Sequence, residues 1–106
     1  MTTLYSDSVA LAAEARLLLP TLLRKDPALG RRFKRVCDEV PVRVAEGMSS
    51  TGRAKRTQYA AARDLTKEAL ACLRAAASVG YLSERDLAIE GSIVQLLDRM
   101  ALAQAA

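Results

Sequence analysis

Apolar side chains recur along this chain at the spacing of three and four residues that is typical of α-helices. The longest stripe consists of Leu29, Phe33, Val36, Cys37, Val40 and Val44. No strand-length run alternates β-branched with polar residues, whereas Ala and Leu, two strong helix formers, are abundant. The pattern predicts an all-α protein with helices at about residues 7–24, 27–46, 53–79 and 84–102.

Short turns separate the predicted helices. Asp26 followed by Pro27 is a helix-start signal, because Asp caps free N–H groups and Pro has no N–H to leave unpaired at the first helical position. Gly80 is expected to end the third helix, because glycine adopts the left-handed conformation of a C-cap. Short connections make consecutive helices antiparallel neighbours. The chain of 106 residues is therefore predicted to form a single domain, residues 1–106, folded as an antiparallel up-down-up-down four-helix bundle.

The first helix has an expected cap and an internal proline. Ser6 or Asp7 is expected to accept hydrogen bonds from the free N–H groups of its first turn. Pro20 removes a backbone donor and clashes with the preceding turn. This helix is therefore expected either to kink near residues 17–19 or to end there with one further loose turn.

Pro41 opens the segment around which the chain is organised. The apolar stripe continues in phase beyond it, so the second helix is expected to kink there and continue. Arg43 and Glu46 are three residues apart, the spacing of an ion pair on one helix face, and are expected to hold the kink in place. Gly47 is expected to end the helix as its C-cap. These residues and Gly80 are assigned structural roles.

The last predicted helix carries more apolar side chains than one neighbouring helix would cover. They are Leu87, Ile89, Ile93, Val94, Leu96, Leu97 and Met100. A helix that is apolar on more than one side usually buries its second side against something else. In a domain of this size, another copy of the chain is the expected cover, which predicts a homo-oligomer.

Charge is distributed unevenly along the chain. Residues 24–67 carry 12 basic and 5 acidic side chains, a local net charge of +7, while the rest has a net charge of −3. A basic middle segment favours an anionic partner, and phosphate is the expected group. The candidate contacts are Arg31, Arg32, Lys34, Arg35, Arg53, Lys55, Arg56 and Arg63. The groups around Arg31 and Arg53 are expected at opposite ends of the bundle, because the second helix runs between them. The alternative is that these cations only keep the surface soluble, paired with Asp38, Glu39 and Asp64.

The sequence offers no constellation for catalysis or metal binding. His is absent, and Cys37 and Cys72 lie on apolar helix faces, where free cysteine behaves as a small hydrophobe. The sequence shows no combination of a nucleophile, a base and a group to orient that base. The apolar run at residues 17–23 is too short for a membrane span, and the N-terminus lacks the features of a signal peptide. We expect a cytoplasmic protein that is not an enzyme and has no metal, no cofactor and no membrane partner.

Three motifs resemble a known bacterial family. The strongest is Val40-Pro41-Val42-Arg43-Val44-Ala45-Glu46-Gly47, which is similar to the family pattern aliphatic-Pro-any-Asn-Ile-Ala-Glu-Gly, with Arg43 in place of Asn. The second is the helix turn Val79-Gly80-Tyr81-Leu82-Ser83, and the third is the basic segment 53–56 followed by the aromatic Tyr59. In these motifs the chain resembles the four-helix-bundle proteins of 23S rRNA intervening sequences, which are related to the Avd-like accessory proteins of diversity-generating retroelements.

The resemblance implies properties that the residue pattern alone does not give. It implies a homo-oligomer, with a ring-like pentamer favoured, and its retroelement members are similar to nucleic-acid-binding adaptors that work with a reverse transcriptase. The hypothesis is therefore a non-enzymatic oligomeric adaptor that binds RNA or DNA through basic surface on the second and third helices. The alternative is a homo-oligomeric protein-interaction scaffold with no nucleic-acid role.

Overall fold

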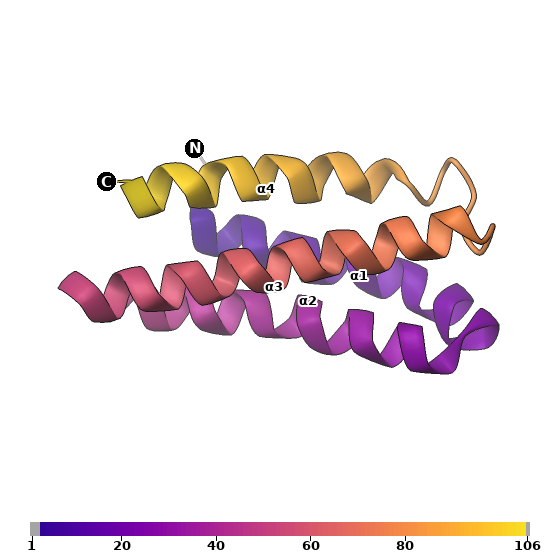
Figure 1. The fold of residues 1–106 in the computed structure, drawn as a ribbon, viewed down its shortest axis with the longest axis horizontal. Helices are drawn as coiled ribbons and strands as arrows, with labels where there is room; N and C mark the ends of the chain where they lie inside the picture. The colour runs from indigo at the N-terminus through magenta and orange to yellow at the C-terminus, as the bar shows by residue number, and fades with distance from the viewer. Residues whose placement is uncertain (1–2, 106) are drawn as a thin grey trace.

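The computed structural model describes residues 3–105, which form four helices in one antiparallel bundle. The helices are α1 (Leu4–Lys25), α2 (Pro27–Met48), α3 (Gly52–Ser78) and α4 (Ala88–Ala105). Consecutive helices run in opposite directions, and both ends of the chain lie at the same end of the bundle (Figure 1). Neighbouring helices pack in the order α1, α2, α3, α4, and α4 closes the bundle against α1. The predicted all-α up-down-up-down bundle is confirmed; residues 1, 2 and 106 of the predicted domain lie outside the described part.

The core is made by one side of each helix. The apolar face of α1 is buried, as are all members of the α2 stripe except the partly buried Leu29. The buried apolar residues of α1 are Leu11, Ala15, Leu18, Leu19 and Leu22. On α3 the buried residues are mostly small, and Thr66 is buried among them with its hydroxyl donating to the carbonyl of Ala62 at 2.8 Å. Small side chains on α3 leave room for its neighbours to approach closely, and the bundle measures 42 × 25 × 19 Å.

The start of α1 differs from the prediction. Thr3 is the N-cap: its hydroxyl accepts from the backbone N–H of Ser6 at 3.0 Å, and the Ser6 hydroxyl accepts from the N–H of Thr3 at 3.0 Å. This reciprocal pair is a capping box, so the expected cap at Ser6 or Asp7 is wrong. The helix then runs as α-helix through Pro20 to Lys25. An end near residues 17–19 is therefore excluded, since buried leucines on both sides of Pro20 keep one face continuous with the core.

Gly47, near the end of α2, is not the C-cap that the sequence predicted. The helix continues through Pro41, as expected, and ends at Met48 with Ser49 as C-cap. Gly47 is buried inside the helix and does not have positive φ. A Cβ atom there would lie 2.5 Å from Cε1 of Tyr59. The glycine is therefore needed for the close approach of α3, a tertiary contact that the local C-cap rule does not represent.

Gly80 ends α3 as predicted. It has a φ of +78°, and its N–H donates to the carbonyl of Ala77 at 3.0 Å, while the N–H of Tyr81 donates to Ala76 at 2.9 Å. These two bonds define a Schellman motif. Val79, the last residue of the predicted third helix, is the C-cap residue and is 62% exposed.

The last helix begins later than predicted. Ser83 and Asp86 make a capping box, with the Ser83 N–H donating to the Asp86 carboxylate at 3.0 Å. Apart from one bond from Leu87 to Ser83, the bonds that follow join residues three apart, as from Ala88 to Arg85 and from Glu90 to Leu87. Such tight turns are not α-helical, so α4 starts at Ala88 instead of Glu84.

The broad apolar face of α4 is used mostly inside the bundle. Ile89, Ile93, Leu96 and Met100 are buried, Leu87 and Leu97 pack partly buried against the core, and Val94 is exposed. The physical reason is that α4 borders both α3 and α1, so it has two seams to cover. The apolar width of this helix alone is therefore a weaker argument for self-association than the sequence suggested.

Candidate nucleic-acid interface

The two predicted groups of cations lie at opposite ends of the bundle. The start of α2, with Arg31, and the start of α3, with Arg53, lie at opposite ends of the long axis (Figure 1). The first group is joined by Arg24 and Lys25 in the last turn of α1. The arrangement follows from the length of α2, since an α-helix advances about 1.5 Å per residue.

Cations and carboxylates alternate on the outer face of α2. The Nε of Arg32 contacts Glu68 of α3 at 2.8 Å, and the Nζ of Lys34 contacts Asp38 at 2.8 Å. Arg31 and Arg35 are exposed and form no ion pair within the described part of the chain, but they share a shallow groove with Lys34, Asp38 and Glu39. Lys34 thus has Asp38, one of the three partners named by the alternative interpretation, whereas Arg32 is paired with Glu68, which that interpretation did not name. A polyanion in this groove would meet the carboxylates of Asp38 and Glu39.

The start of α3 has a different character. Residues 47–63 contain no Asp or Glu. Arg53, Lys55 and Arg56 are all exposed and have no ion-pair partner within residues 3–105. Thr51 is the N-cap but makes no side-chain cap bond. Free N–H groups and the helix dipole add partial positive charge to these cations, so this end of the bundle offers an anion three cations that no carboxylate of residues 3–105 neutralises.

Arg63 does not belong to that exposed cluster. It is partly buried between α3 and α4, where its Nη1 donates to the Oε1 of Gln104 at 3.4 Å. Its Nε is buried and has no acceptor within the described residues. The sequence grouped Arg63 with the surface cations by charge alone, whereas the structure places it behind them.

Arg43 ties the end of α2 to α3. It contacts Glu46 at 3.6 Å, as predicted, and also Glu39 at 3.5 Å, while its Nη1 donates to Gln58 of α3 at 3.3 Å. Glu46 holds the following turn through its backbone, because its carbonyl accepts from the Ser50 hydroxyl at 2.8 Å. These contacts give Arg43 and Glu46 structural roles and keep Arg43 out of the basic surface.

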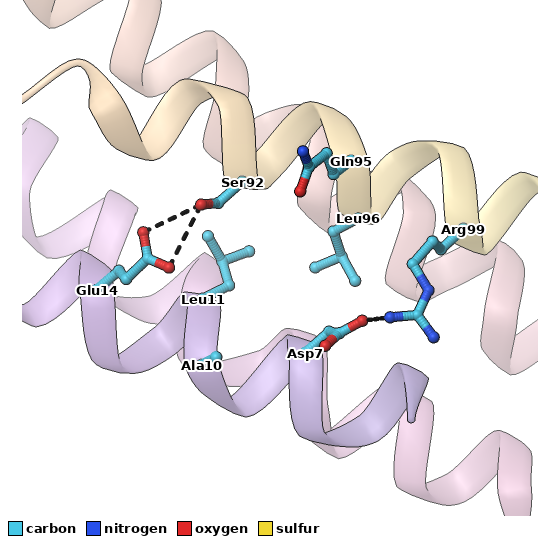
Figure 2. A pocket seen from close by; sticks show the side chains of 8 residues that line it. All are labelled: Asp7, Ala10, Leu11, Glu14, Ser92, Gln95, Leu96 and Arg99. Atoms are coloured by element: carbon cyan, nitrogen blue, oxygen red, sulfur yellow. Dashed lines mark hydrogen bonds and ion pairs between the residues drawn. The ribbon is translucent and has the colours of Figure 1, made fainter. Parts of the chain in front are cut away.

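A polar groove of about 260 Å³ lies between α1 and α4. Figure 2 shows Asp7 and Glu14 of α1 facing Arg99 and Ser92 of α4. Asp7 and Arg99 form an ion pair, and the Ser92 hydroxyl lies 3.2 and 3.3 Å from the two carboxylate oxygens of Glu14. Each carboxylate thus has a polar partner on α4, and these two contacts hold α1 against α4. Sequence reasoning missed this pairing, since its members are far apart along the chain.

The two cysteines are buried thiols facing the α2–α3 seam. Burial, together with Asp38 and Cys72, raises the pKa of Cys37 to about 12. The pKa of Cys72 is also raised, mainly by burial, with Arg32 opposing the shift. Both side chains therefore remain neutral thiols near pH 7 and act as packing groups, as the sequence predicted.

The raised pKa of Cys37 predicts a loss of stability in alkali. Above pH 9.0, the model thiol value, the unfolded chain loses this proton, while the folded chain keeps it until about pH 12. The unfolded state then binds fewer protons, so the free energy of unfolding falls as pH rises. From pH 9 to pH 10 the loss should be about 1 kcal/mol. Urea unfolding of wild type and Cys37→Ala at both pH values measures it, and equal losses in the two proteins would exclude Cys37 as the cause.

No group of three or more His, Cys, Asp or Glu side chains within the described residues is placed to hold a metal ion. No helix in residues 3–105 is long and apolar enough to cross a membrane.

Comparison with known proteins supports the fold. No protein-family model matches the chain, and no curated protein matches it in sequence. A solved structure does match, with a TM-score of 0.91 over 98% of this chain and 100% of the other, at 12% sequence identity. It is a protein of unknown function from the S23 ribosomal protein family of Bacteroides thetaiotaomicron VPI-5482. The chain therefore has the four-helix fold of an S23-family protein, and the resemblance to 23S rRNA intervening-sequence proteins is confirmed at the level of that fold.

Proposed function

We propose that this protein is a non-enzymatic adaptor that binds RNA or DNA through the start of α3. The observation that supports the proposal is the cluster of Arg53, Lys55 and Arg56, three exposed cations in a stretch of 17 residues, 47–63, without any carboxylate. Cations that are not paired within the protein are available to replace the counterions of a phosphate backbone. The α2 face is expected to contribute less to phosphate binding, because Arg32 and Lys34 already form ion pairs with carboxylates of this chain.

The mode of binding follows from the aromatic side chains. Phe33 and Tyr59 are buried at 0% and 8% exposure, so neither offers a free face for stacking a base. Tyr5, 42% exposed, is on α1, whose main neighbours are α2 and α4 and not α3, and Tyr81 packs partly buried against the core. Binding without stacking platforms reads backbone charge and shape, so the adaptor is expected to have little sequence preference.

Self-association strengthens this proposal. A homo-oligomer, with the pentamer implied by the resemblance, would repeat the α3 cluster around a ring and multiply the phosphate contacts of one chain. Affinity then rises with each phosphate that is neutralised. A reverse transcriptase is the enzyme partner that the resemblance implies for such an adaptor.

A salt titration tests the proposal. We expect fluorescence anisotropy to detect binding of a labelled 20-nucleotide single strand at ~50 mM salt and a steep loss of affinity by ~200 mM. Three phosphate contacts per chain correspond to a slope of about −2 for log K against log salt on single strands, and a ring would give a steeper one. No binding of either RNA or DNA at ~50 mM salt would refute the proposal.

A protein-interaction scaffold is the second candidate, and exposed apolar residues on α1 and α2 favour it. Val9 and Val42 are 43% and 52% exposed, and Val9 lines a shallow groove with Pro41 between the two helices. Under this alternative, a partner protein recovered by the chain from cell extract should remain bound after nuclease treatment. Under the first proposal, nuclease should release whatever is recovered.

A further inference from the structure

A pocket of about 280 Å³ lies where the start of α3 meets the end of α4. Gly52, Lys55, Arg56 and Tyr59 line it from one face of α3, at the helical spacing of three and four residues, and Ala103 and Gln104 line it from α4. The Lys55 ammonium lies 5.8 Å from the centre of the Tyr59 ring. The Tyr59 ring is buried and packs against Gly47 of α2.

The charged side chains that line this pocket are both hydrogen-bond donors, although the last turn of α4 also leaves backbone carbonyls without helical partners beside it. Lys55 and Arg56 are cations, and no carboxylate is among the lining residues. The Oε1 of Gln104 accepts from Arg63 at 3.4 Å, which leaves the amide nitrogen of Gln104 as the group available to a ligand. Arg63 adds a further positive charge directly behind that amide. The positive charge and the donor groups of this pocket therefore suit an anion with several acceptor oxygens.

We infer that this pocket takes one phosphate group of the bound nucleic acid, and this inference rests on the function proposed above. The phosphate oxygens accept from Lys55, Arg56 and the Gln104 amide, and the Tyr59 ring forms an apolar wall against the adjoining sugar. Arg53 lies outside the pocket and attracts the backbone without fixing it. A single seated phosphate sets the register of the strand on the bundle, which diffuse surface charge alone does not do.

The test uses two isosteric substitutions in the full chain. Gln104→Glu keeps an oxygen facing Arg63 but replaces the donor amide by a second oxygen and a negative charge. Gln95→Glu makes the same chemical change on the same helix, outside the pocket. Binding of the labelled 20-nucleotide strand at ~50 mM salt should weaken about tenfold or more in Gln104→Glu and by less than about twofold in Gln95→Glu. Thermal melting of both variants confirms that the fold is intact.

The outcomes separate this inference from the proposed function. If wild type binds the strand and both variants weaken equally, the pocket inference is overturned while the function stands. If wild type does not bind, the proposed function fails, and the pocket is then judged with inorganic phosphate. In that experiment, phosphate should shift the backbone amide resonances of Lys55, Tyr59 and Gln104 in wild type and leave them unchanged in Gln104→Glu. An absence of such shifts in wild type would dismiss the pocket as a phosphate site.

Discussion

Gly47→Ala should destabilise the protein, whereas Gly91→Ala should stabilise it. Alanine is the better helix former by about 1 kcal/mol, and both glycines lie inside helices. At Gly91 a Cβ atom meets nothing within 4 Å, so the gain should appear in full. At Gly47 it would lie 2.5 Å from the ring of buried Tyr59. Overpacking costs about 1–3 kcal/mol, so after the gain in helix propensity the net result there should be a loss of up to about 2 kcal/mol.

A double mutant cycle tests whether the Tyr59 ring causes the destabilisation by Gly47→Ala. In a Tyr59→Ala background the ring is gone, and Gly47→Ala should then raise the free energy of unfolding by up to about 1 kcal/mol. The sign of the substitution therefore reverses between the two backgrounds. Urea unfolding of the four proteins measures the cycle. A Gly47→Ala effect that is the same in both backgrounds would mean that α2 and α3 do not meet at this contact.

Arg53→Glu combined with Arg56→Glu should weaken nucleic-acid binding about 100-fold or more at ~50 mM salt. The change removes two uncompensated cations and places two repelling carboxylates at the start of α3. The fold should tolerate it, because both positions are exposed and acidic residues near a helix N-terminus are stabilising. Anisotropy with the labelled strand gives the affinity, and circular dichroism gives the melting temperature.

Lys67→Glu combined with Arg85→Glu is the matched control for that pair. It changes net charge equally at two exposed positions that have no ion-pair partner in residues 3–105 and lie far along the chain from the α3 start. We expect the affinity for the labelled strand to fall by less than about fivefold, because the positive electrostatic field of the whole protein is weaker. Equal losses in the two double variants would show that net charge, and not the α3 cluster, controls binding.

The sequence predicted the elements of this fold because each depends on residues a few positions apart. A stripe with helical period commits Phe33, Val36 and Val40 to one side of α2, and all are buried at 1% exposure or less. Gly80 ended α3 as expected, since the Schellman motif is entirely local. Short turns fixed the alternation of helix direction, and with it the separation of the two basic groups.

The errors arose where a local rule competed with a tertiary contact. Gly47 looked like a C-cap, but packing against Tyr59 of α3 explains it. The apolar width of α4 suggested a subunit interface, but most of it covers two seams of its own bundle, and self-association stays a prediction. The start of α4 was placed too early because a Ser-Asp box can cap a single tight turn as well as a helix.

The sequence by itself determined four helices, their core faces and a surplus of positive charge in the middle of the chain. Only the tertiary structure decided which cations are free, since Arg32 is neutralised by Glu68 from 36 residues away, whereas no carboxylate reaches Arg53 or Arg56 within the described residues. It likewise created the α3–α4 pocket, which joins Lys55 to Gln104. The physical reason is range: helical periodicity acts over about four residues, while ion pairs and pockets depend on the register between helices that packing alone sets.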